Sequence, residues 1–250
     1  MHEKIMMSET EFKKEYYEKI YPSGELKKTS INWWSVRFYA LLSEKILKGR
    51  RGKILDIGCG IPFILARLEK EHETWGMDIS GYAHEKGKAV APRSRLFLSN
   101  IEEGVPAGIP GNYFDLIISK YIFEHLRNPE EVLVRCCALL APGGRIIISV
   151  PNTESPVRKL KKDEWFGVTD KTHVSLLEPH EWTDMVKRNN LRIEKIFSDG
   201  FWDVPYVKFI PKWLQYPLFS IPSAIEVFLA YPMLPPKWGE NIIIIARKVP

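Results

Sequence analysis

From Lys53 to Val150, the hydrophobic and polar positions follow two alternating patterns. Short apolar runs of the kind that form buried strands are separated by stretches in which apolar residues recur at helical spacing. The runs begin at Lys53, Glu73, Arg95, Phe114 and Arg145. This alternation is typical of an α/β fold in which helices cover both faces of a mostly parallel sheet.

Both ends of the chain add elements to this core. Two aromatic-rich amphipathic segments, Glu9 to Tyr21 and Ile31 to Lys48, predict helices ahead of the first strand. After the core, the sequence predicts a helix from Pro179 and strands that begin at Leu191 and Glu240. The long connection between the last two strands favours an antiparallel pair at one edge, as in many mixed sheets. The predicted fold is a doubly wound, mostly parallel seven-stranded sheet with an antiparallel edge strand.

Composition and charge narrow the class of protein. Of the 250 residues, 45% are hydrophobic and 27% are charged, which is typical of one globular domain with elaborations. The 36 basic and 31 acidic residues give a net charge of +5 without a basic tail, so no nucleic-acid partner is predicted. Cys59, Cys136 and Cys137 lack the spacing of a disulfide framework or a zinc site, so no metal is predicted. A charged N-terminal segment without an apolar run predicts a cytoplasmic protein.

The run LDIGCG carries the candidate chemistry. It places Gly58 and Gly60 directly after the first strand, where a β-carbon would obstruct a nucleoside lying across the carboxyl end of the sheet. Asp56 stands just ahead of the turn. Asp78 ends the next strand, where its carboxylate can accept hydrogen bonds from both hydroxyls of a ribose. The two acids and the glycine turn predict a nucleoside-binding site.

These motifs resemble the class I (Rossmann-like) S-adenosylmethionine-dependent methyltransferase family, in its small-molecule type. The resemblance covers Lys53 to about Val150, and the run FDLIISKYIFEHL is similar to the family's fourth strand and the segment after it. It implies that S-adenosylmethionine is the cofactor and that its methyl group passes to a small-molecule acceptor.

The resemblance also assigns residues around the cofactor. Gly58 and Gly60 would line the methionine and ribose, and Asp78 would hold the ribose hydroxyls. Asn100 and Ile101 would flank the adenine. The remaining cofactor-binding residues that the resemblance implies are Asp56, Cys59, Ile79 and Ser119, the last beside the methionine portion.

Departures from the family pattern leave alternatives open. Pro62 stands where the family often has a third glycine, although proline suits the first turn of a helix. Asn100 replaces a commoner aspartate. A dinucleotide site would need a small residue where Phe63 stands, which disfavours an NAD-dependent oxidoreductase. A noncatalytic S-adenosylmethionine-binding domain is the main alternative to an enzyme.

A histidine is the candidate for proton transfer at the acceptor. The segment VTDKTHVSLLEPHEW resembles a stretch near the active-site mouth of small-molecule members, and it makes His173 the candidate general base for an acceptor hydroxyl. The alternative is that Asp170 and His173 only brace the segment. His125 is interpreted as structural.

Residues 201–238 are unusually apolar for an insertion. Pro217, Pro222 and Glu226 interrupt the run, so no membrane-spanning helix is predicted. The segment is predicted to form a pocket wall for a partly apolar or lipid-linked acceptor, with peripheral membrane contact or a homodimer interface as alternatives. The whole is predicted to be a single methyltransferase domain, residues 1–250. It is divided into a helical cap (1–50), a cofactor-binding core (51–150), and insertions that cover the acceptor site (151–177 and 200–238).

Overall fold

A seven-stranded sheet forms the centre of the computed structural model, which describes residues 12, 14–229 and 231–249. The strand order is β3-β2-β1-β4-β5-β7-β6, and β7 runs antiparallel to both of its neighbours while the other pairs are parallel. The strands are β1 (Lys53–Ile57), β2 (Glu73–Asp78), β3 (Arg95–Leu98), β4 (Phe114–Lys120), β5 (Leu140–Pro151), β6 (Leu191–Ser198) and β7 (Asn241–Lys248). The predicted fold class is confirmed, with the antiparallel strand placed second from the edge.

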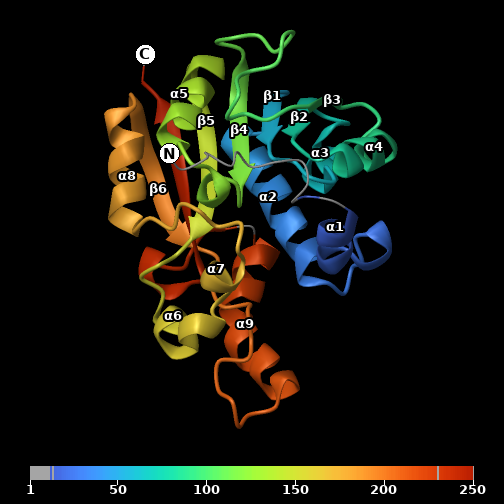
Figure 1. Cartoon of the computed structure of the whole chain (residues 1–250). Helices are drawn as coiled ribbons and strands as arrows, with labels where there is room; N and C mark the ends of the chain where they lie inside the picture. The colour runs from blue at the N-terminus through green and yellow to red at the C-terminus, as the bar shows by residue number, and fades with distance from the viewer. Residues whose placement is uncertain (1–11, 13, 230, 250) are drawn as a thin grey trace, which may run out of the picture.

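Helices cover both faces of this sheet (Figure 1). They are α1 (Lys14–Ile20), α2 (Ile31–Leu47), α3 (Phe63–Leu68), α4 (Gly81–Val90), α5 (Pro129–Leu139), α6 (Pro156–Lys161), α7 (Phe166–Thr169), α8 (Pro179–Arg188) and α9 (Lys212–Leu229). Short 3₁₀ turns are η1 (Pro22–Gly24), η2 (Phe123–His125), η3 (Lys162–Glu164) and η4 (Pro236–Trp238).

The apolar runs of the sequence follow from burial on both faces. Successive residues of a strand point to opposite faces. In β7, Ile242 and Ile244 pack with α5 and α8, whereas Ile243 and Ile245 pack with α2 and α3. A strand covered on both sides therefore reads as a continuous apolar run rather than an alternating one.

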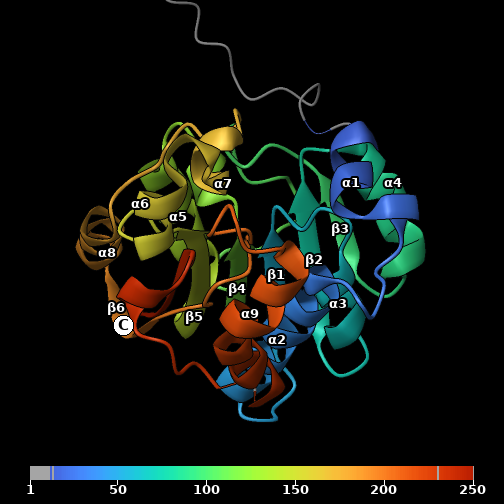
Figure 2. The ribbon, with the colours of Figure 1, turned by 90° about the horizontal axis from the view of Figure 1, so that it is seen from below.

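The N-terminal helices lie against the strands that carry the glycine turn. Ser30 caps α2, its hydroxyl accepting a hydrogen bond from the Trp33 amide at 3.2 Å. Of the helix predicted from Glu9 to Tyr21, α1 forms the C-terminal part, while residues 9–11 and 13 lie outside the described residues. Figure 2 shows α1 beside α4 and α9 beside α2.

The two predicted insertions pack against each other. Residues 151–177 form α6, η3 and α7, and residues 200–238 include α9, which extends away from the sheet (Figure 1). The rings of Phe166 and Trp202 lie 4.8 Å apart, and Val157 packs with Val204 and Tyr206. Within the described residues, no helix combines the length and the hydropathy that crossing a membrane requires.

Candidate active site

The glycine turn connects β1 to α3. Gly58 and Gly60 have φ values of +69° and +52°, in the left-handed region that favours glycine. The amides of Gly58 and Cys59 both donate to the carbonyl of Met77, at 2.8 and 3.0 Å. A β-carbon on Gly58 would lie 1.9 Å from Ile122 Cδ1, and one on Gly60 would lie 3.1 Å from Tyr17. The left-handed backbone and the contact with Ile122 together favour glycine at position 58 even before a ligand is considered.

A pocket of about 210 Å³ opens at this turn, at the carboxyl ends of β1, β2 and β4. Its walls include all but one of the cofactor residues predicted from the sequence: Asp56, Gly58, Cys59, Gly60, Asp78, Ile79, Asn100 and Ile101. Ser119 is the exception, because its hydroxyl is buried inside the fold and the next residue, Lys120, lines the pocket instead.

Asp78 is held in place by three hydrogen bonds. Its Oδ2 accepts from the Gly60 amide at 2.7 Å, and its Oδ1 accepts from the Ser80 amide at 2.8 Å and from the Tyr17 hydroxyl at 3.3 Å. Burial raises the pKa of Asp78, and these hydrogen bonds oppose that rise. A carboxylate has about four acceptor positions. One ribose hydroxyl therefore fits directly, and a second would replace the long bond from Tyr17.

Asp56 gives the pocket a second acidic group. Its side chain is 3% exposed and makes no hydrogen bond to another described residue, and burial raises its pKa to about 8. Lys120 faces it, with a pKa lowered to about 8 by burial. Because an unpaired buried carboxylate is costly, a cationic ligand group beside Asp56 would be stabilised.

The remaining predicted residues form the side of the pocket next to β3. Asn100 is fixed in a local turn, its Oδ1 accepting from the Glu102 amide at 3.0 Å and its Nδ2 donating to Glu103 at 3.2 Å. Ile79 and Ile101 supply apolar surface on either side. This combination suits a flat base with a polar edge.

Several lining residues lie outside the set of cofactor-binding residues predicted from the sequence. Phe12 and Tyr16 join Tyr17 over the pocket, since residues near α1 fold back across the turn. Tyr121 also lines it and has a φ of +59°, a conformation that is uncommon for a bulky residue and is often found at functional sites. The predicted strand FDLIIS ends at Ser119, so Lys120 and Tyr121, the next two residues, were not placed in the site.

The positions of His125 and His173 are the reverse of those suggested by the sequence. His125, interpreted as structural, lines the pocket, whereas His173, the predicted general base, is not among the lining residues. The two rings lie 4.7 Å apart. Burial, with a contribution from His173, lowers the pKa of His125 to about 4, so its imidazole is neutral near pH 7.

Comparison with known proteins gives the family. Residues 34–196 match the family model described as a methyltransferase domain. The chain belongs to this family. The prediction of a class I methyltransferase is thereby confirmed, and S-adenosylmethionine is the cofactor of that class.

Curated relatives match over part of their length. The chain is 28% identical over 104 residues to a ubiquinone biosynthesis O-methyltransferase of Pectobacterium carotovorum, covering 40% of this chain and 43% of the relative. A protein of the same name from a Caulobacter species is 27% identical over 180 residues, covering 64% of this chain and 66% of the relative. The chain thus spans less than half of the first relative's length and about two thirds of the second's.

Solved structures share the fold over more of the chain. A SAM-dependent methyltransferase from Archaeoglobus fulgidus superposes with a TM-score of 0.61 at 20% identity, covering 93% of this chain and 98% of the other. The plantazolicin methyltransferase BpumL, solved with a desmethyl plantazolicin analogue and SAH, gives a TM-score of 0.60 at 17% identity, covering 94% and 89%. At these identities, the likeness concerns the fold.

The residues present fit S-adenosylmethionine. Asp56 offers an unpaired carboxylate to the cationic methionine portion, and Asp78 retains an acceptor position for a ribose hydroxyl. The turn at Gly58 lets the backbone approach closely between them. Bound S-adenosylmethionine would supply the transferable methyl group.

Replacing Asp78 with asparagine tests this placement. We expect D78N to weaken S-adenosylhomocysteine binding by about 1–3 kcal/mol, or about 5- to 150-fold in Kd, because ribose hydroxyls lose a charged acceptor. Titration calorimetry measures the change, and D163N, at an exposed aspartate of η3, is the matched control. An unchanged Kd in a D78N protein with normal melting temperature would refute the assignment.

Proposed function

We propose that this protein transfers the methyl group of S-adenosylmethionine to a hydroxyl group on a small, partly apolar molecule. The observation that carries the proposal is a second pocket, of about 750 Å³, that meets the cofactor pocket. Asn32, Lys120 and Tyr121 line both pockets. A molecule in the second pocket can therefore reach the cofactor at this junction.

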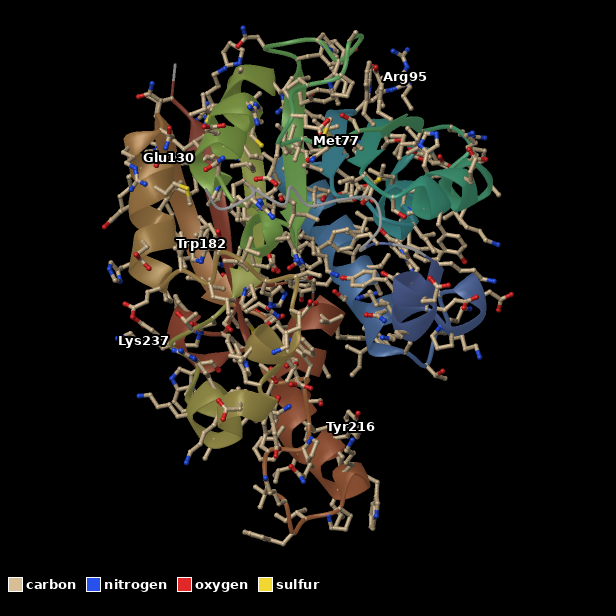
Figure 3. The ribbon with its side chains drawn as sticks, in the orientation of Figure 1. Met77, Arg95, Glu130, Trp182, Tyr216 and Lys237 are labelled. Atoms are coloured by element: carbon tan, nitrogen blue, oxygen red, sulfur yellow. The ribbon has the colours of Figure 1, made fainter. Side chains whose placement is uncertain are left out.

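The second pocket lies between α2 and α9. Trp34 and Phe38 of α2 face Ile225, Val227 and Phe228 of α9, together with other mainly apolar side chains. Figure 3 shows Tyr216, another lining residue, on the part of α9 that extends from the body of the protein. Such walls favour an acceptor with a long or bulky apolar portion.

Polar groups gather where the two pockets meet. Asp199 accepts hydrogen bonds from the Tyr121 hydroxyl at 3.3 Å, the Trp202 indole at 3.0 Å and Asn241 Nδ2 at 2.5 Å. The Lys120 ammonium lies 4.2 Å from the centre of the Tyr121 ring. An acceptor with a polar head and an apolar tail fits this distribution, with its head at the junction.

Methyl transfer proceeds by in-line displacement, so positioning both reactants supplies much of the acceleration. The curated relatives named as O-methyltransferases support an oxygen acceptor. An alcohol or phenol oxygen attacks well only after losing its proton, so a base at the junction would help. Lys120 lines the junction, which makes it a better placed candidate than His173.

The role of Lys120 predicts a pH dependence. A base must be neutral, and the neutral fraction of an amine with a pKa of about 8 grows as the pH rises through that value. We expect kcat to rise with pH through about 8, and the rise to disappear in K120M.

The pH experiment needs two further measurements. K159M, at an exposed lysine of α6, should keep the wild-type profile. S-adenosylhomocysteine affinity shows whether K120M has disturbed the cofactor through Asp56. An unaltered pH profile in K120M would exclude Lys120 as the base and return the role to His173.

The apolar pocket predicts a preference for tailed acceptors. A series of phenols and catechols with alkyl tails of increasing length can be screened by release of S-adenosylhomocysteine. We expect kcat/KM to increase with each buried methylene, by at most about fourfold at about 0.8 kcal/mol. A224W, which narrows the pocket, should abolish this gain and leave short acceptors and cofactor affinity unchanged.

L218W is the control, because Leu218 lies on the same helix but outside the pocket lining. Equal kinetics for long and short tails would contradict the acceptor pocket. Cofactor binding without turnover of any acceptor would support the alternative of a noncatalytic binding domain.

We further propose that the outer surface of α9, together with the residues just before it, contacts a lipid surface from which an apolar acceptor enters. Phe209 is 90% exposed and Trp213 is 71% exposed, and the exposed Lys208 and Lys212 flank them. Aromatic and basic side chains together are typical of segments that lie in a membrane interface. The same helix lines the acceptor pocket, which favours a lipid contact over a homodimer interface.

Vesicle binding tests the lipid contact. We expect the protein to sediment with vesicles that contain anionic phospholipid, and the double variant F209S/W213S to do so at least about tenfold more weakly, since two large apolar groups are lost. V134S, at an exposed apolar residue of α5, is the control. The opposite outcome has two parts: the wild-type protein does not bind vesicles, and it forms a dimer in the ultracentrifuge that the double variant does not form. Together these results would identify a homodimer interface instead.

A further inference from the structure

Glu124, His125 and His173 form a cluster that the proposed methyl transfer, with Lys120 as its base, does not use. One ligand atom from each of the three lies within 4.8 Å of the other two. Ligand atoms on one ion with bonds of 2.0–2.2 Å lie at most about 4.4 Å apart, so small side-chain shifts would allow the three groups to share a single ion. The cluster lies directly behind the cofactor pocket, which His125 lines.

The main chain holds the two contributing segments together. The amides of Val174 and Ser175 both donate to the carbonyl of Glu124, each at 2.9 Å. His173 therefore comes beside η2, next to Thr172, which contacts His125 from 47 positions away in the chain. Because the two segments are far apart in the chain, the sequence shows no local spacing of metal ligands, and no metal was predicted from it.

The hydrogen bonds around His125 fix which ring nitrogen carries the proton. The Thr172 hydroxyl donates to Asp170 Oδ1 at 2.6 Å, so its oxygen accepts from His125 Nδ1 at 2.9 Å. The carbonyl of Thr172 is a second acceptor for Nδ1, at 3.2 Å. With the proton on Nδ1, the lone pair of the neutral ring is on Nε2.

His173 is oriented in the same way. Its Nδ1 donates to the carbonyl of Gly167 at 2.8 Å. Its Nε2 lies 3.8 Å from Asp170 Oδ2, which is too long for a hydrogen bond. Metal-binding histidines almost always donate their second ring nitrogen to a carbonyl or carboxylate, and both rings here have that support.

Glu124 supplies an independent observation. Its side chain is 1% exposed, and its Oε2 is buried without a hydrogen-bond partner among the described residues. Buried polar atoms are nearly always satisfied, so an orphaned carboxylate oxygen beside two oriented imidazoles calls for a ligand. A divalent cation would satisfy all three groups at once.

We propose that Glu124, His125 and His173 bind a divalent transition-metal ion of the zinc class. Two imidazoles and one carboxylate are one of the donor sets of catalytic zinc sites, in which the remaining position takes water or substrate. Magnesium is disfavoured because it prefers oxygen donors. His125 belongs to both the cluster and the lining of the cofactor pocket, so an ion held here would lie next to that pocket.

Metal binding can be measured without an acceptor or turnover. The full-length protein, freed of metal by chelation, is titrated with Zn²⁺ and with Co²⁺, whose visible absorption reports nitrogen and oxygen ligands, and with Mg²⁺ for comparison. We expect one equivalent of Zn²⁺ or Co²⁺ to bind and to raise the melting temperature. Failure of this test leaves the methyl transfer proposal standing, since its own test is acceptor turnover.

Two conservative variants separate ligation from folding. E124Q keeps the shape of the side chain. H173N keeps a donor near the position of Nδ1 for the Gly167 carbonyl and removes Nε2. We expect each to weaken Zn²⁺ binding by at least about tenfold, because even changes beyond the ligands typically cost 10- to 100-fold.

The control is H180A, in the exposed group of Glu154, Glu178 and His180, which has the same spacing but no burial. It should leave the stoichiometry and affinity unchanged. Absence of stoichiometric Zn²⁺ or Co²⁺ binding, tighter binding of Mg²⁺, or equal Zn²⁺ affinity in wild type, E124Q and H173N would each overturn the assignment.

Discussion

The hydrogen bond from the Gly60 amide to the Asp78 carboxylate joins the parts of the site. It connects the turn after β1 to the end of β2, and the same carboxylate holds the start of α4 through the Ser80 amide and α1 through Tyr17. A charged acceptor strengthens each of these bonds relative to a neutral one. The shape of the pocket therefore depends on one buried carboxylate that is also the expected partner of the ribose.

The pKa values of the ionisable groups at the site are shifted because these groups are buried away from water. Burial raises the pKa of both Asp56 and Glu124 to about 8 and lowers that of Lys120 to about the same value. Each charged form is disfavoured unless an opposite charge lies nearby. A sulfonium beside Asp56, and a metal ion beside Glu124, would supply such charges. Asp56 lines the pocket and Glu124 lies buried next to His125, which also lines it, so the two groups are separate places where a positive charge would be stabilised.

The sequence predicts the features that depend on local pattern. Apolar runs located all seven strands, and the glycines with Asp56 and Asp78 located the pocket, because strand burial and turn conformation leave traces in neighbouring residues. Features that form only when segments far apart in the chain come together leave no pattern in the local sequence. Lys120 and Tyr121 follow the last residue that the strand pattern could place, and His173 meets Glu124 only through tertiary packing. Chain order also could not show that β7 lies between β5 and β6.

That position of β7 explains why the apolar insertion lies at the site. β6 runs in the same direction as β1 to β5, so its carboxyl end is at the edge of the sheet that carries the glycine turn. β7 runs the opposite way and begins at that edge. The connection between them, with α9, must therefore leave from and return to the edge where open α/β sheets bind their ligands. Most of its residues lie outside the seven paired strands, so the proposed acceptor pocket can differ between proteins that keep the same cofactor pocket.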